Sequence, residues 1–188
     1  ALANAVLTLG SRLDGGKAAQ EQYDAADNMT QQLSALACLL QENVGETALA
    51  KFYEQWKHDR LVMDKWFGLQ VSCAAPEDTA TTAENLTIHA DFDHKNPNRF
   101  RATLGALAMC HAGFHHISGR GYTLLADWLI TLDPINPQTT ARMCSAFQTW
   151  KRYDEARQNM MLAEIDRILS QPNLSRDTTE MLTRIRTA

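Results

Sequence analysis

The sequence lacks any apolar run of about 18 residues, any signal-peptide pattern and any cluster of lysine and arginine. A membrane-spanning helix is therefore not expected. A net charge of -4 over 188 residues also offers no basic surface for a nucleic acid or an anionic membrane. We expect a globular protein with neither a membrane nor a nucleic acid as partner.

Cysteine is scarce and never occurs in C-x-x-C spacing. The four cysteines lie 34 to 37 residues apart, each within an apolar helical pattern: Cys38, Cys73, Cys110 and Cys144. This distribution favours free, buried thiols in a reducing compartment over a disulfide framework or a zinc knuckle. We therefore predict a cytoplasmic protein.

Catalytic motifs are missing as well. The sequence contains no H-E-x-x-H metal motif, no G-x-S-x-G nucleophile motif and no G-x-x-x-x-G-K-[ST] phosphate loop. His111 and His115 have the i, i+4 spacing that can hold zinc, but Gly113 and the loop after Ile117 argue against one continuous helix there. The loop 118–121 is better explained as a helix connection than as an anion site. We predict no catalytic residue, no metal ligand and no cofactor in this chain.

Alternation of apolar and polar residues, the signature of strands, is also absent. Helical periodicity instead predicts about nine or ten helices of some 9–18 residues within one all-α domain, residues 1–188. The first is expected over residues 1–9, stopped by Gly10. Helix pairs recurring about every forty residues indicate an irregular α-solenoid of the HEAT or armadillo kind. An irregular helical bundle remains the alternative.

Three helix starts have capping-box spacing: Asn28 with Gln31, Asn43 with Glu46, and Thr81 with Glu84.

A short connection at residues 58–59 should make the helices on either side of it antiparallel neighbours.

One construction occurs twice, forty positions apart. Asn96-Pro97 and Asn136-Pro137 both read as an Asn N-cap followed by Pro at the first helical position. The first start is followed by Arg99 and Arg101 and the second by Arg142. Cations near a helix start oppose its dipole, so these arginines either pair with carboxylates of the same domain or face an anionic ligand. The residues alone leave both interpretations open.

In these two segments and in several others, the chain resembles the C-terminal domain of bacterial aminopeptidase N, a zinc-dependent metallopeptidase of the thermolysin-like superfamily. No single string is distinctive, but their order and spacing are. The matching strings are residues 53–59, 61–67, 95–101, 114–115, 121–122, 132–138, 141–142, 152–154 and 174–177. The segment 72–89 matches poorly.

The resemblance implies that this chain is a C-terminal fragment of a four-domain enzyme whose zinc ligands and catalytic Glu lie upstream. The domain would be a helical superhelix that covers a chamber in which single residues are released from peptide N-termini. Its partners would be the upstream catalytic domain and peptide substrates. The alternative is an independent helical-repeat module that binds a protein or peptide, but the uncapped apolar start at Leu2, Val6 and Leu7 favours a cut from a longer protein.

The family places arginines on the chamber wall, and the positions that match them are Arg101 and Arg142. We predict that both contact the C-terminal side of peptide substrates. Arg99 and Arg120 are weaker candidates, and Arg99 is expected to have a structural partner. The family usually has an acidic residue and Gly-Ser-Gly-Tyr where this chain reads Ser118-Gly119-Arg120-Gly121-Tyr122, which puts the usual pairing of that loop in doubt.

Overall fold

A computed structural model of the protein describes residues 2–188, with side chains from residue 4 onward. The predicted domain contains two compact units, residues 1–75 and 76–188. In the described chain every regular element is helical, as predicted. The first unit consists of α1 (Leu2–Asp14), α2 (Lys17–Ala25), α3 (Met29–Gln41), α4 (Glu46–Trp56) and α5 (Arg60–Cys73).

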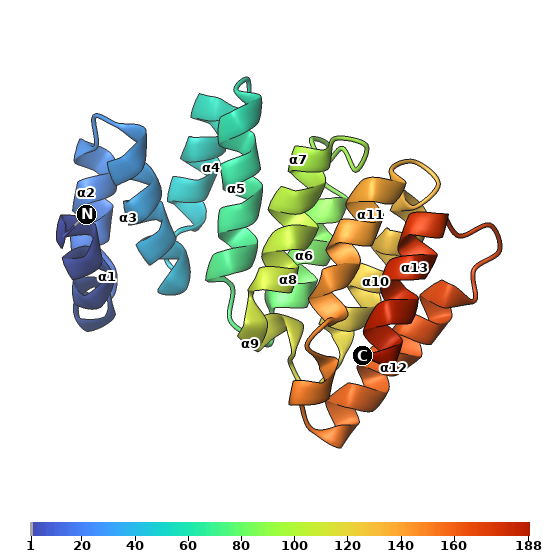
Figure 1. Cartoon of the computed structure of the whole chain (residues 1–188). Coiled ribbons are helices and arrows are strands. Elements are labelled where there is room, and N and C mark those ends of the chain that lie inside the picture. The colour runs from blue at the N-terminus through green and yellow to red at the C-terminus, as the bar shows by residue number, and fades with distance from the viewer. Residues whose placement is uncertain (1) are drawn as a thin grey trace. The chain divides into compact units, whose positions relative to one another are not determined.

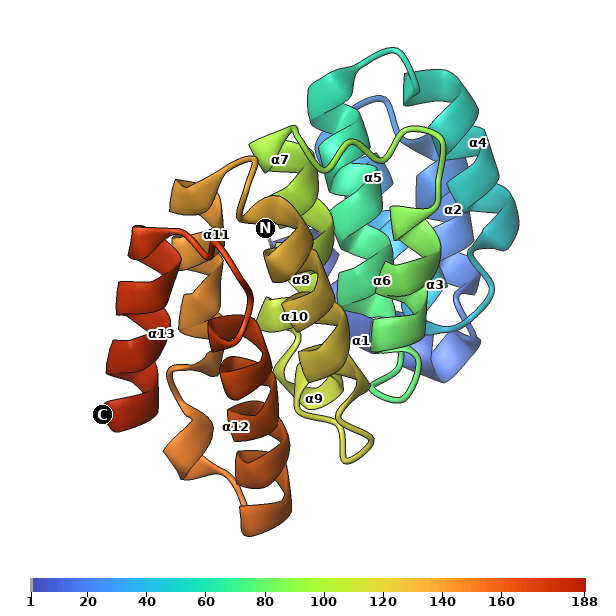
Figure 2. The ribbon, with the colours of Figure 1, turned by 90° about the vertical axis from the view of Figure 1, so that its right-hand side faces the viewer.

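The second unit has two layers of helices. In one layer α10 packs between α6 and α12. In the other, α11 lies between the α7 to α8 segment and α13 (Figures 1 and 2). The elements are α6 (Thr79–Thr87), α7 (Pro97–Phe100), α8 (Ala106–Met109), α9 (His111–Phe114), α10 (Arg120–Leu132), α11 (Pro137–Met143), α12 (Glu155–Leu169) and α13 (Arg176–Thr187).

Helix starts were predicted best where the capping residue acts locally. The side chain of Asn28 accepts a hydrogen bond from the Gln31 N–H, so α3 begins as predicted. The start predicted at Asn43 is wrong, because Asn43 has a positive φ of 57° and ends α3 instead. The start predicted at Thr81 is also wrong, since α6 already begins at Thr79.

The first helix does not stop at Gly10. It continues to Asp14 and ends at Gly15 and Gly16, which both have positive φ. Burial of Leu7 and Ser11 on the side of α1 that faces the first unit outweighs the cost of one glycine in the helix. The uncapped start expected at Leu2 concerns a side chain that lies outside the described ones.

The helix predicted after Pro97 is divided into several segments. After α7 the backbone forms a π-helix, Arg101–Gly105, before α8, and the non-helical ψ of Cys110 separates α8 from α9. The Pro137 helix likewise gives way to the 3₁₀ segments Cys144–Phe147 and Trp150–Arg152. These divisions explain why the helical segments outnumber the nine or ten predicted.

The connection at residues 58–59 does join neighbouring helices. The side chain of Asp59 caps α5 through the N–H groups of Leu61 and Val62. Across the pair, the rings of Tyr53 on α4 and Trp66 on α5 have centroids 5.2 Å apart. The two helices therefore pack against each other as neighbours, as the sequence predicts.

A buried carboxylate joins α10 to the last helix of the second unit, α13. Asp133, which follows α10 and is only 3% exposed, accepts hydrogen bonds from the Ser175 N–H at 2.7 Å, from the Ser175 hydroxyl at 2.7 Å and from the Thr178 hydroxyl at 2.6 Å. Ser175 in turn caps α13. The Asp133 side chain therefore fixes the start of α13 against the end of α10.

All four cysteines are free, and Cys38 and Cys144 are buried. Burial, together with the nearby Asp133 carboxylate, raises the pKa of the Cys144 thiol to about 12. That thiol therefore stays protonated at neutral pH. Among the described residues, no helix combines the length and apolarity needed to cross a bilayer.

Two glycines should respond in opposite ways to replacement by alanine. A Cβ at Gly10 would meet no atom within 4 Å, so Gly10→Ala should stabilise α1 by about 1 kcal/mol. A Cβ at Gly113 would lie 2.2 Å from the Thr79 hydroxyl oxygen, so Gly113→Ala should destabilise the protein by about 1–3 kcal/mol. Urea unfolding of the two variants measures both changes. If both variants changed the free energy of unfolding equally and in the same direction, these two expectations would be wrong.

Candidate functional site

Both Asn-Pro segments are helix starts, as predicted. Asn96 accepts a hydrogen bond from the Asn98 N–H at 3.1 Å, and Asn136 accepts one from the Thr139 N–H at 3.0 Å. In each case proline occupies the first turn, where its missing N–H leaves no donor unsatisfied. The two starts set the positions of the candidate arginines on α7 to α8 and on α11.

Arg99 points into the protein. It is 5% exposed, and its Nη1 donates to the backbone carbonyl of Asp91 in the segment that precedes α7. The Arg99 guanidinium thus has the structural contact expected for it. It holds the segment before α7 and is not displayed to a ligand.

Arg101 is exposed and begins the π-helical segment. Its Nη2 donates to the side-chain oxygen of Asn98 at 2.7 Å. One turn further on, Gly105 has no side chain, and a Cβ there would contact only the Arg101 Cβ at 3.5 Å. The surface beside Arg101 is therefore open.

Arg142 is also exposed and lines a groove of about 510 Å³ between α11 and α13. From α11 the groove is lined by Gln138, Ala141 and Arg142, and from α13 by Asp177, Glu180, Met181 and Arg184. Within residues 4–188 the Arg142 guanidinium makes no hydrogen bond or ion pair. It remains available to an anionic group that enters the groove.

Arg101 and Arg142 come from neighbouring segments of one layer, because α11 lies beside the α7 to α8 segment in both views (Figures 1 and 2). The structure thus separates the four candidates. It exposes Arg101 and Arg142 on one layer, buries Arg99, and places Arg120 on α10 in the other layer.

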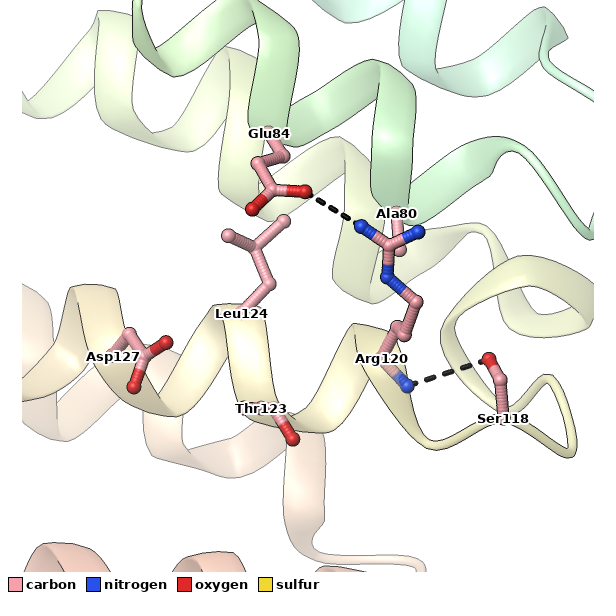
Figure 3. Close-up of a pocket in the computed structure, with 7 residues that line it drawn as sticks. All are labelled: Ala80, Glu84, Ser118, Arg120, Thr123, Leu124 and Asp127. Carbon is pink, nitrogen blue, oxygen red and sulfur yellow. Dashed lines mark hydrogen bonds and ion pairs between the residues drawn. The ribbon is translucent and has the colours of Figure 1, made fainter.

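Arg120 is engaged with α6. Its Nη2 pairs with Glu84 at 2.7 Å, and its Nη1 donates to the Thr81 hydroxyl at 2.9 Å. Figure 3 shows this guanidinium directed toward Glu84. Both side chains line a small pocket of about 180 Å³. The arginine that departs from the family pattern thus joins α10 to α6, with a carboxylate on the other helix.

The loop before α10 depends on two glycines. Gly119 has a φ of 68°, in the left-handed region that favours glycine. A Cβ at Gly121 would lie 2.7 Å from the backbone oxygen of Phe114. These positions match the glycines of the family pattern, and their role in this chain is structural.

The histidines of residues 111–116 do not converge. His115 is buried, its ring stacks on Tyr153 with centroids 3.9 Å apart, and its Nδ1 lies 2.9 Å from the Tyr122 hydroxyl oxygen. Burial, with smaller effects of His111 and Arg157, lowers the pKa of His115 to about 4. Burial raises the pKa of Tyr122 to about 12. Both side chains are neutral at pH 7.

Metal-binding side chains do not cluster in the part of the chain that the structure describes, where no group of three or more His, Cys, Asp or Glu is arranged to hold an ion.

Sequence reasoning missed the α13 wall of the groove. Arg184 and Glu180 lie about forty residues after Arg142 and share no motif with it. The only signal was the Ser175 cap, which indicates where α13 begins but not which helix it packs against.

The family described as a domain of unknown function with ARM repeats (DUF3458_C) matches residues 1–187. The chain belongs to this family. The description agrees with the helical-repeat fold predicted from the pairing of helices.

Three relatives of the chain are named aminopeptidase N. The chain is 39% identical to aminopeptidase N of Haemophilus influenzae, 37% to that of Caulobacter vibrioides and 35% to that of Escherichia coli, over 89%, 85% and 87% of this chain. It spans only 20%, 19% and 19% of those proteins. The resemblance to the C-terminal domain of bacterial aminopeptidase N is thereby confirmed.

A solved structure gives the same result. Legionella pneumophila aminopeptidase A, determined in complex with aspartic acid, matches with a TM-score of 0.85 at 34% identity. The match covers 90% of this chain and 20% of that protein.

The buried His115 makes stability depend on pH. The unfolded chain binds a proton on this histidine near pH 6.5, whereas the native state resists protonation down to about pH 4. Stability should therefore fall as the pH drops through this window, by on the order of 2–3 kcal/mol between pH 8 and pH 4.5. Urea unfolding between pH 4.5 and 8 measures this loss.

His115→Asn should remove this pH dependence of the free energy of unfolding. The matched control, His116→Asn, should retain it. His116 is only half-buried and bonds to Ser118. Identical profiles for wild type and His115→Asn would rule out His115 as the source.

Proposed function

We propose that this chain is the non-catalytic C-terminal domain of a zinc-dependent aminopeptidase that releases N-terminal amino acids from peptides in the cytoplasm. The supporting observation is the similarity of nearly the whole chain to about a fifth of each aminopeptidase N relative. Zinc and the catalytic residues would lie in the upstream portion of the polypeptide, which is this domain's partner. Peptides would be the shared substrate.

The described residues support a role outside the chemical step. His115 and Tyr122, whose side chains lie within hydrogen-bond distance of each other, are buried and have pKa values that keep both neutral at pH 7. Cys144 is buried and protonated. None of these groups is positioned to exchange protons with a substrate.

In this proposal the domain covers the active-site chamber and controls which peptides enter and bind. Arg101 and Arg142 are exposed on one layer, and Arg142 has no partner within residues 4–188. An arginine can bind a carboxylate through two parallel hydrogen bonds. The two arginines would attract and hold the C-terminal side of peptides, which acts on affinity and association rate more than on the chemical step.

Mixing the separated parts tests the domain's role. The 188-residue chain with added zinc should not hydrolyse alanyl p-nitroanilide. Adding it to the separately expressed upstream portion should change the ratio of tetrapeptide to p-nitroanilide hydrolysis, because only the larger substrate reaches the chamber wall. Activity of the chain alone would refute the non-catalytic assignment. An unchanged ratio would refute the chamber role and favour an independent binding module.

Replacing the two arginines in the complete polypeptide tests their role. Arg101→Gln and Arg142→Gln should each raise the KM for a tetrapeptide about 5- to 10-fold, which corresponds to about 1–1.4 kcal/mol, with kcat little changed. Alanyl p-nitroanilide has no carboxylate, so its KM should stay constant. Steady-state kinetics with both substrates gives the comparison.

Arg176→Gln is the matched control, because Arg176 is exposed on α13 but does not line the groove. It should leave both KM values unchanged. If Arg101→Gln and Arg142→Gln behave like this control, neither arginine contacts the peptide.

A further inference from the structure

The face of α1 directed away from the first unit is aliphatic. Val6, Leu9 and Leu13 are 60%, 68% and 91% exposed. Their spacing of three and four residues places them in one stripe of the helix. The opposite face carries Leu7 and Ser11, which are buried against the rest of the unit.

This stripe differs from the other exposed apolar side chains in the described chain. The remaining ones occur singly, each in a different helix or loop: Val44, Leu61, Ile88, Met109, Ile117 and Ile135. Single exposed apolar residues are ordinary in proteins, whereas a contiguous apolar surface marks an interaction site. Among the described helices, only α1 groups three exposed large apolar side chains on one face.

Gly10 gives a second, independent indication. It lies on the same side of α1, four residues after Val6 and three before Leu13. A glycine inside a helix costs about 1 kcal/mol relative to alanine, yet a Cβ here would meet nothing within 4 Å. Nothing in the described fold requires this glycine. A surface that packs closely over α1 would require it, because the missing side chain leaves a notch between the aliphatic side chains.

We infer that Val6, Leu9 and Leu13 form a docking surface for an aliphatic surface of the upstream portion of the same polypeptide, seated over Gly10. This inference rests on the proposed function, which supplies the upstream portion. The relatives are about five times as long as this chain, so most of such a protein lies outside this structure.

The size of the surface also favours this occupant over a second copy of the chain. A stable complex of separate proteins buries about 800 Å² on each partner, more than three side chains provide. A covalently connected partner is held at high effective concentration, so a small apolar contact is enough. The upstream portion meets that condition and a second copy does not.

Cysteine labelling tests the contact directly. Leu13→Cys is introduced into the 188-residue chain and into the complete polypeptide, and maleimide modification is followed by mass spectrometry of the peptide that contains residue 13. Labelling should be fast in the chain, because this position is 91% exposed. It should be at least 50-fold slower in the complete polypeptide.

Equal labelling in both proteins would overturn the inference while leaving the proposed function intact, provided that the complete polypeptide hydrolyses peptides. Protection in the 188-residue chain that grows with protein concentration would also overturn it, because the occupant would then be a second copy. A complete polypeptide without aminopeptidase activity would instead refute the proposed function.

A second substitution tests the notch. Gly10→Leu combined with Leu13→Cys should leave labelling of the 188-residue chain unchanged, because position 10 has free space in this fold. In the complete polypeptide the same change should speed labelling at least 10-fold by separating the two surfaces. The matched control is Leu61→Cys, 69% exposed on α5, whose labelling Gly10→Leu should not alter. No effect of Gly10→Leu in the complete polypeptide would show that nothing packs over Gly10.

Discussion

The packing of the second unit depends on the hydrogen bonds that the carboxylate of Asp133 accepts from the start of α13. Three donors converge on this buried side chain, two of them from Ser175. A buried carboxylate is stable only when hydrogen bonds replace its lost hydration. Because α13 forms one wall of the groove that contains Arg142, the same contact determines the shape of the candidate peptide surface. Asp133 therefore affects both the packing of the second unit and the proposed peptide surface, although it does not line the groove itself.

The fold was predictable where the determining contacts are local. Asn28, Asn96 and Asn136 cap their helices through N–H groups two or three residues ahead, so the sequence alone locates these starts. Gly10 shows the opposite case. Its cost in a helix is a local property, but burial of the other face of α1 against α2 and α3 decides the outcome. Such burial depends on residues that a local pattern does not contain.

The candidate site was predictable in part for the same reason. Arg99 and Arg101 are two residues apart, and two steps of about 100° place them on nearly opposite faces of a helix. One is consequently buried and the other exposed, a division that helical periodicity can anticipate. The partner of Arg120 could not be anticipated, because Glu84 lies 36 residues earlier and on another helix. The α13 side of the groove was missed because packing, not spacing, brings it to α11.

The π-helical segment at Arg101 has a consequence for how this domain varies among its relatives. A π-helical turn holds one residue more than an α-helical turn, so it is equivalent to a single-residue insertion in an ordinary helix. Deleting one residue there would restore regular hydrogen bonding and would leave the residues beyond it on the faces that they now occupy. Leu107, which is fully buried, would stay in the core. This helix can therefore lose one residue at the π-helical segment, whereas a second deletion would rotate everything beyond it by about 100°.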